Sequence, residues 1–239
     1  MLKEQENLLE RNALLGWRGI RYCLDRPEIF KHQLRALLRA GCIGNLHILI
    51  PMISCKKEIT AVRNLIKEIE QECEQNRIPY KKDIPIGIMI EVPSAAIAAD
   101  LYAPTVDFFS IGTNDLIQYV LSVDRGDDSV SHLYQPDHPA VLKTIQHIIR
   151  TANRVKKSVS ICGEMAGDTA FTRILLGMGL RRFSMNPNNL LAVKNIVLHS
   201  DTERLRHETA KLLRNDDPEK SEKLLKALNS ISVAVETAQ

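Results

Sequence analysis

Short apolar runs alternate with longer segments of helical periodicity along this chain, and this alternation limits the possible folds more than any other feature. Four runs, at residues 46–52, 85–92, 107–112 and 159–163, are predominantly apolar, and each precedes a segment with apolar residues at helical spacing. Strands that are apolar on both faces are typical of a parallel sheet covered by helices. The sequence therefore predicts an α/β fold with a parallel sheet.

Two weaker segments, residues 17–21 and 182–185, bring the number of predicted strands to six. A closed (β/α)8 barrel has eight strands. Polar residues follow the ends of the predicted strands, as active-site residues do in such barrels. We therefore expect a (β/α)8 TIM barrel that lacks its first two strand–helix units, rather than an open doubly wound sheet.

Helices are expected between the strands and throughout the C-terminal part. Helical periodicity or helix-prone composition predicts them at residues 27–40, 56–77, 94–103, 139–157, 169–178, 189–198, 202–214 and 218–231. Pro27 is expected near the start of the first, and Ser94 as the N-cap of the third. Residues 1–11 are polar and helix-prone, which predicts a lead-in helix. We treat residues 1–239 as one partial barrel domain whose residues 201–239 form C-terminal helices.

The composition excludes several classes of protein. A hydrophobic content of 44% in 239 residues is enough for a sizeable core. The net charge of +3 comes from interspersed signs, which argues against a nucleic-acid-binding stripe. No apolar run is long enough to span a membrane and the first residues do not resemble a signal peptide, so we expect a cytoplasmic protein.

Two further sequence patterns are missing. The five cysteines contain no CxxC pair, which argues against a disulfide framework and a zinc site. No GxGxxG or GxxxxGK[ST] motif is present, so neither common Gly-rich phosphate loop is expected.

Two carboxylates stand at predicted strand ends. Glu91 ends the apolar run IGIMIE, and Asp115 follows the next strand in GTND. A pair of carboxylates with open positions suits Mg²⁺, which keeps several waters and binds substrate oxygens. An alternative interpretation is that both side chains cap the helices that follow them.

Several other residues allow both a functional and a structural interpretation. Arg18 and Arg125 are candidate clamps for phosphate or carboxylate, or else solvated surface arginines. Cys162, at a strand end, is a candidate nucleophile or proton donor, or else a small core residue. His47 begins a predicted strand without a partner at metal-ligand spacing, which favours a structural role.

The motif GTNDLIQYVLSVDRG, with DFFSIG before it and SHLYQPDHPAVL after it, resembles the enzyme I family of the bacterial phosphotransferase system, the phosphoenolpyruvate–protein phosphotransferases. LGWRGIR, IGIMIEVPSAA and ICGEMAGD resemble the same family in the same order, over roughly residues 12–200. The resemblance implies a (β/α)8 phosphoenolpyruvate (PEP)-binding domain that forms a homodimer and works with Mg²⁺. It also implies transfer of the phosphoryl group to a histidine domain and then to a histidine-containing phosphocarrier protein.

The resemblance also implies roles for individual residues. Glu91 and Asp115 match the metal ligands, and Asn114, Asp115 and Arg125 match substrate-binding positions. Arg18 matches a phosphate-binding arginine, and Cys162 matches the acid that protonates the enolate to pyruvate. Mg²⁺ and the arginines would neutralise the phosphate while the thiol supplies a proton.

The sequence departs from this family in two important ways. The N-terminal domain with the acceptor histidine, the first two barrel strands and one phosphate-binding arginine have no counterpart in these 239 residues. His47 stands where the family has an arginine that faces the phosphate. These departures leave open an alternative, a truncated remnant or dimerisation module without transfer activity. A third interpretation, a relative of PEP synthase or of a dikinase, fits the flanking motifs less well.

Overall fold

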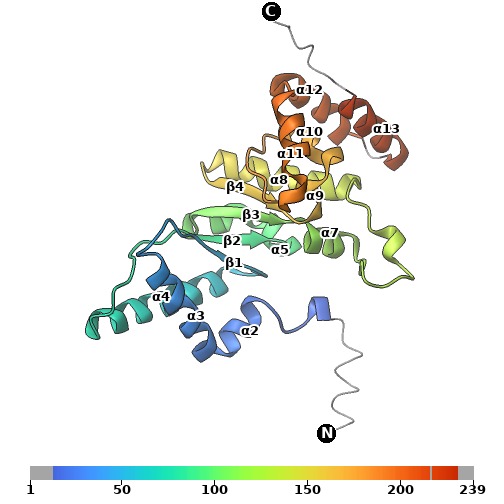
Figure 1. Cartoon of the computed structure of the whole chain (residues 1–239). Helices are drawn as coiled ribbons and strands as arrows, with labels where there is room; N and C mark the ends of the chain where they lie inside the picture. Colours follow the sequence, from blue (N-terminus) through green and yellow to red (C-terminus); the bar gives the residue numbers. More distant parts are fainter. Residues whose placement is uncertain (1–12, 216, 231–239) are drawn as a thin grey trace, which may run out of the picture.

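A parallel four-stranded sheet forms the centre of the protein. The structure is a computed structural model, and it describes residues 13–215 and 217–230. The strands lie in the order β1-β2-β3-β4 and span Ile48–Ile50, Ile86–Ile90, Phe108–Gly112 and Ser158–Cys162. Figure 1 shows them side by side in the middle of the molecule. The predicted α/β fold with a parallel sheet is confirmed.

Helices connect the strands and form the C-terminal part. The helices before and between the strands are α2 Ile20–Asp25, α3 Pro27–Ala40, α4 Lys56–Gln75, α5 Pro93–Ile97, α6 Ala99–Tyr102, α7 Thr113–Leu121 and α8 Pro139–Arg154. After β4 follow α9 Glu164–Gly167, α10 Thr169–Gly177, α11 Leu190–Leu198, α12 Thr202–Leu213 and α13 Pro218–Asn229. In Figure 1, α3 and α4 lie near β1, and α10, α12 and α13 lie beyond β4. Among the described residues, no helix combines the length and apolar character needed to cross a membrane.

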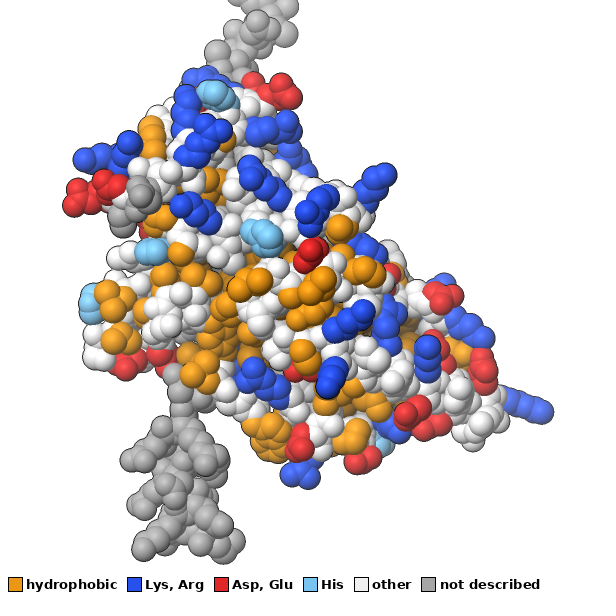
Figure 2. Space-filling model, turned by 180° about the vertical axis from the view of Figure 1, so that it is seen from behind, with side chains coloured by type: hydrophobic (Ala, Val, Ile, Leu, Met, Phe, Trp, Pro, Cys, Tyr) orange, Lys and Arg blue, Asp and Glu red, His pale blue; other side chains and the backbone are white. Residues whose placement is uncertain are grey.

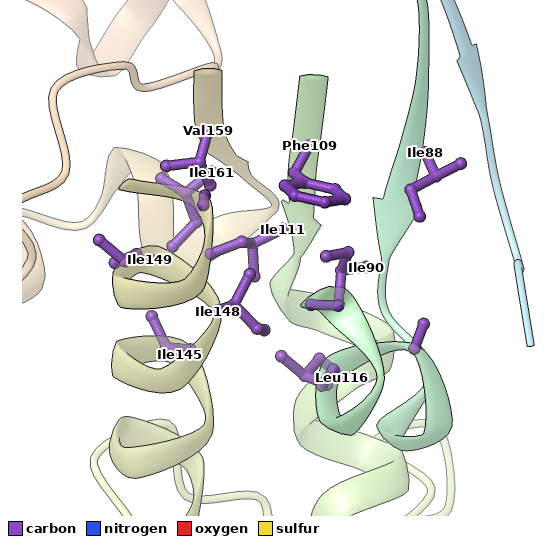
Figure 3. Close-up of a cluster of buried hydrophobic side chains, with 14 of the residues drawn as sticks. Ile88, Ile90, Phe109, Ile111, Leu116, Ile145, Ile148, Ile149, Val159 and Ile161 are labelled. Atoms are coloured by element: carbon purple, nitrogen blue, oxygen red, sulfur yellow. The ribbon is translucent and has the colours of Figure 1, made fainter. Parts of the chain in front are cut away.

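One face of the sheet packs against helices and holds the core. Ile90 of β2 and Ile111 of β3 are fully buried and point toward the helices, as Figure 3 shows. Ile145 and Ile148 of α8 are also fully buried and close this layer. Because side chains alternate along a strand, the residues between these isoleucines face the other side.

The opposite face of the sheet is more polar and partly exposed. The strand register aligns Met89 with Ser110 and Ser110 with Ser160, so these three side chains form one row on this face. Ser110 is buried, whereas Met89 and Ser160 are half-buried. Cys162, at the end of β4, is two residues beyond Ser160 and therefore lies on this same polar face, at the edge with the candidate site residues.

The strand order favours one kind of α/β sheet over another. Each connection leads to the next strand in the same direction, without a reversal of strand order. Since crossovers between parallel strands are right-handed, this order places successive helices on the same side of the sheet. A doubly wound sheet has a reversal of strand order. The order therefore agrees with an arc of a (β/α) barrel.

Two of the six predicted strands are wrong. Residues 17–21 run into a helix, because Gly19 turns the chain with a φ of 57° and α2 begins at Ile20. An added Cβ at Gly19 would lie 2.8 Å from side-chain atoms of Met52, so this turn requires glycine. Residues 182–185 form only an isolated parallel bridge between Phe183 and Ile161. The part of the chain that the structure describes thus has four strands and one bridge.

The helix predictions need smaller corrections. The predicted helix at residues 94–103 is divided into α5 and α6, and α5 starts at Pro93. Ser94 is not its N-cap: its hydroxyl donates to the backbone oxygen of Ser54 instead. The predicted lead-in helix at residues 1–11 lies outside the described residues.

Candidate active site

The candidate site residues gather at the carboxyl edge of the sheet. Glu91 follows β2, Asn114 and Asp115 lie in the first turn of α7 after β3, and Cys162 is the last residue of β4. Parallel neighbouring strands end at the same edge, so these side chains come from three adjacent strand ends. Active sites of barrel enzymes lie at this edge.

Glu91 is a buried carboxylate held by the backbone. Its side chain accepts a hydrogen bond of 2.6 Å from the backbone N–H of Met52, and the residue is 5% exposed. Gly112 leaves room for it, since an added Cβ there would lie 2.8 Å from Glu91 Oε2. No side chain caps α5, which excludes the alternative that Glu91 is its cap.

The carboxyl groups of Glu91 and Asp115 are neighbours. Burial raises the pKa of Glu91 to about 6, the Met52 hydrogen bond opposes this, and the negative charge of Asp115 adds to it. The proximity of the two carboxyl groups thus favours the protonated form of Glu91. The two candidate metal ligands therefore lie close enough for each charge to act on the other.

Arg18 neutralises Asp115 from the loop before α2. Its Nη2 donates to Asp115 Oδ2 at 2.5 Å and to the hydroxyl of Tyr119 at 2.8 Å. The Tyr119 hydroxyl in turn donates to the backbone oxygen of Leu14. Sequence reasoning missed Tyr119, although its position four residues after Asp115 on a helix places both side chains on one face.

Arg125 and Asn114 meet a different partner, Glu164. Arg125 Nη1 lies 2.8 Å from Glu164 Oε1 in an exposed ion pair. Asn114 Oδ1 accepts a hydrogen bond of 2.9 Å from the backbone N–H of Glu164. Asn114, Cys162 and Glu164 line a cavity of about 450 Å³. The structure thus brings Arg18 to the carboxylates and Arg125 to the neighbouring strand end, and no sequence pattern indicated Glu164.

The Cys162 thiol stays protonated near neutral pH. Burial raises its pKa, the hydrogen bond from Ser110 opposes the rise, and the negative charge of Glu91 adds to it. Its Sγ donates to the backbone oxygen of Ile111 at 3.4 Å. A cysteine nucleophile reacts as the thiolate. These surroundings therefore suit a proton donor better than a nucleophile.

The residues present fit a magnesium ion. The described residues contain no cluster of three or more His, Cys, Asp or Glu side chains that could hold a metal. Mg²⁺ does not need such a cluster, because it usually binds one or two carboxylates and takes its other ligands from water and substrate. The neighbouring carboxyl groups of Glu91 and Asp115 match this requirement.

His47 does not face the candidate phosphate site. It precedes Ile48, the first residue of β1, and its ring lies 5.4 Å from the ring of Phe108, the first residue of β3. His47 therefore lies at the amino end of the strands, opposite the edge with Glu91 and Cys162. In this chain the His47 side chain is therefore not placed to bind a phosphate at the candidate site.

The buried carboxyl of Glu91 predicts a pH-dependent stability. Because its pKa is about 6 in the folded protein and 4.5 without burial, the folded state binds more protons between these values. Stability from this group is therefore present at low pH and is lost as pH rises from about 4.5 to about 6. Without metal, Glu91→Gln should exceed the wild type in free energy of unfolding by about 2 kcal/mol at pH 8 and by little at pH 4.

Urea unfolding in the presence of a chelator measures this difference at each pH. The matched control is Glu28→Gln, which changes an exposed carboxyl in the first turn of α3. A difference between Glu91→Gln and wild type that is constant with pH would contradict the prediction.

Comparisons with known proteins identify the family of this chain. Residues 1–202 match the family described as “PEP-utilising enzyme, PEP-binding domain”. A phosphoenolpyruvate-protein phosphotransferase of Cupriavidus necator is 46% identical over 91% of this chain and 37% of its own length. Proteins of the same name from Buchnera aphidicola and Priestia megaterium are 48% and 47% identical, over 79% and 78% of this chain and 33% and 32% of their own lengths.

A solved structure supports the fold. A citrate lyase from Burkholderia xenovorans is similar with a TM-score of 0.53 and 18% sequence identity, over 83% of this chain and 67% of that chain. The chain spans about one third of the length of the curated relatives it matches. Because the family match extends over most of the chain, we conclude that the protein belongs to the family of the PEP-binding domain of PEP-utilising enzymes.

Proposed function

We propose that this chain is the PEP-binding, Mg²⁺-dependent part of a phosphoenolpyruvate–protein phosphotransferase. The phosphoryl group of PEP would pass to a histidine on a domain outside this chain, and from there to a histidine-containing phosphocarrier protein. The observation that supports this most strongly is the adjacent pair Glu91 and Asp115, with Arg18 bound to the second and the thiol of Cys162 at the next strand end. The names of the similar phosphotransferases point the same way.

Substrate binding is assigned to the charged residues of the carboxyl edge. Glu91 and Asp115 would hold Mg²⁺, which neutralises negative charge on the phosphate and the enolate when bound. Arg18 and Arg125 would bind substrate oxygens, because a guanidinium pairs with phosphate or carboxylate through two parallel hydrogen bonds. Asn114 would contact substrate from the first turn of α7.

Protonation of the enolate is assigned to Cys162. Departure of the phosphoryl group leaves the enolate of pyruvate, whose carbon three needs a proton. In this step the S–H bond of Cys162 breaks, the electron pair of the enolate double bond forms the new C–H bond, and the sulfur keeps its electron pair as a thiolate. A thiol whose pKa is raised by burial is still protonated when this step begins.

The proposal includes a homodimer in the cytoplasm. Figure 2 shows hydrophobic side chains gathered across the middle of one face of the molecule. Among the exposed apolar residues, Ile97 and Leu101 on neighbouring helices are 76% and 64% exposed. Large exposed apolar areas are typical of surfaces that bind another protein, which favours a second copy of the chain as a partner.

Thermal unfolding tests the proposed binding site. Mg²⁺ and PEP together, at about 100 times the dissociation constant, should raise the free energy of unfolding by about 2.7 kcal/mol. Either ligand alone should raise it much less, because the carboxylates and the substrate complete one coordination shell together. A transition temperature that the two ligands leave unchanged would overturn the proposal.

A further inference from the structure

Ser110 makes an unusual contact in the middle of β3. It is 4% exposed and lies on the partly exposed, polar face of the sheet. Its hydroxyl donates a hydrogen bond to Cys162 Sγ at an oxygen–sulfur distance of 3.7 Å. The Cys162 thiol donates its own hydrogen to the backbone oxygen of Ile111 at 3.4 Å. Sulfur is thus held between one donor and one acceptor.

The neighbouring serine provides a comparison. Ser160 lies opposite Ser110 in the register of β3 and β4 and on the same face. Its hydroxyl donates to the backbone oxygen of Phe109 at 3.4 Å, which is an ordinary way to satisfy a hydroxyl beside a strand. Ser110 instead directs its hydrogen to a side chain of the candidate site. Sulfur is a weak acceptor when neutral and a strong one when it carries a negative charge.

We propose that Ser110 is a positioning residue for Cys162, which holds the sulfur at the strand end and stabilises the thiolate left after proton transfer. This inference rests on the proposed role of Cys162 as the proton donor. The thiolate would form at a half-buried position where the Ser110 hydroxyl already points at it, so no hydroxyl has to reorient during the step. The hydroxyl hydrogen stays on Ser110 throughout.

The charges around the thiol explain why such a donor is needed. Burial raises the pKa of Cys162, and the negative charge of Glu91 at the end of β2 raises it further. Both effects oppose formation of the thiolate, and the hydrogen bond from Ser110 acts in the opposite direction. Ser110 therefore limits how weak an acid Cys162 becomes, while Cys162 still begins the step as a thiol.

The reactivity of Cys162 as a function of pH tests this coupling without any substrate. Alkylation of the intact chain by iodoacetamide, followed by mass spectrometry of the peptide that contains Cys162, separates this residue from the exposed Cys42 and Cys55. In Ser110→Ala the midpoint of the alkylation profile should rise by about one pH unit, since a hydrogen bond to a charged group has roughly that effect on a pKa. Ser110→Thr, which keeps the hydroxyl, should restore the midpoint.

Ser160→Ala is the matched control, because it removes the same atom from the same face and register row. Its midpoint should equal that of the wild type. A midpoint in Ser110→Ala that is unchanged, or that rises equally in Ser160→Ala, would overturn the inference.

A second measurement separates this inference from the proposed function. In D2O with Mg²⁺ and pyruvate, the proposed function predicts exchange of the methyl hydrogens of pyruvate, which Cys162→Ala abolishes and Ser110→Ala slows. Exchange that Cys162→Ala leaves unchanged would overturn the proton-donor role of Cys162. The alkylation profile would then still decide whether Ser110 stabilises the thiolate.

Discussion

Asp115→Ala is expected to abolish the stabilisation that Mg²⁺ and PEP together give this chain. The wild type should gain about 2.7 kcal/mol in free energy of unfolding at ligand concentrations about 100 times the dissociation constant, and the variant should gain close to nothing. The reason is that Asp115 neighbours Glu91 and binds Arg18 at 2.5 Å, so its loss removes a candidate metal ligand and releases the candidate phosphate-binding arginine. Thermal unfolding with and without both ligands measures the difference.

Asp100→Ala is the control for a lost carboxylate. Asp100 lies on α6, and its ion pair with Arg154, at 3.8 Å, joins two exposed side chains. This variant should keep the full ligand-induced shift, because exposed ion pairs contribute little to stability. An Asp115→Ala variant that is still stabilised by the two ligands would show that PEP and Mg²⁺ bind elsewhere.

Gly163→Ala is expected to lower the free energy of unfolding by about 4 kcal/mol. Gly163 links β4 to α9 with φ 86° and ψ −174°, a conformation that residues with a Cβ rarely adopt. An added Cβ would lie 2.4 Å from Thr113 Oγ1 and 2.7 Å from Asn114 Oδ1. The methyl group would therefore strain the turn and displace a candidate substrate-binding residue. Urea unfolding measures the loss of stability.

Gly44→Ala provides the matched comparison for the same chemical change. No atom lies within 4 Å of the position that its Cβ would take, and Gly44 is not among the glycines with positive φ. Its free energy of unfolding should stay within about 0.5 kcal/mol of the wild type. Equal losses in the two variants would contradict the steric explanation for Gly163.

Local sequence patterns predicted most of the secondary structure correctly. The apolar runs at residues 46–52, 85–92 and 107–112 contain β1, β2 and β3, and the run at 159–163 overlaps β4 in all but its first residue. The helix predicted at residues 27–40 is α3, with the same bounds. Residues 17–21 were mispredicted, because a short segment with apolar residues and a glycine fits a strand, a turn or a helix equally well by its own pattern. The positive φ of Gly19 and the close approach of Met52, far along the chain, are not visible in this local pattern.

In the candidate site too, local patterns indicated some residues, and contacts between distant segments decided the others. Glu91, Asp115 and Cys162 were identified because each stands at the end of an apolar run, and parallel strands bring such ends to one edge. The resemblance to a known family then indicated their roles. Tyr119 and Glu164 were missed, since their importance comes from contacts with Arg18 and Arg125, which are distant in the sequence.

The sequence by itself determined the order of strands and helices, the buried faces and the edge at which the site lies. These follow from short-range periodicity, because burial of an apolar run is favourable whichever elements pack against it. Only the tertiary structure decided that Arg18 binds Asp115 and not Glu164, that His47 lies at the opposite end of the sheet, and that Ser110 points at Cys162. Such pairings depend on how separate elements pack, and a sequence pattern carries no distance between residues that are far apart in the chain.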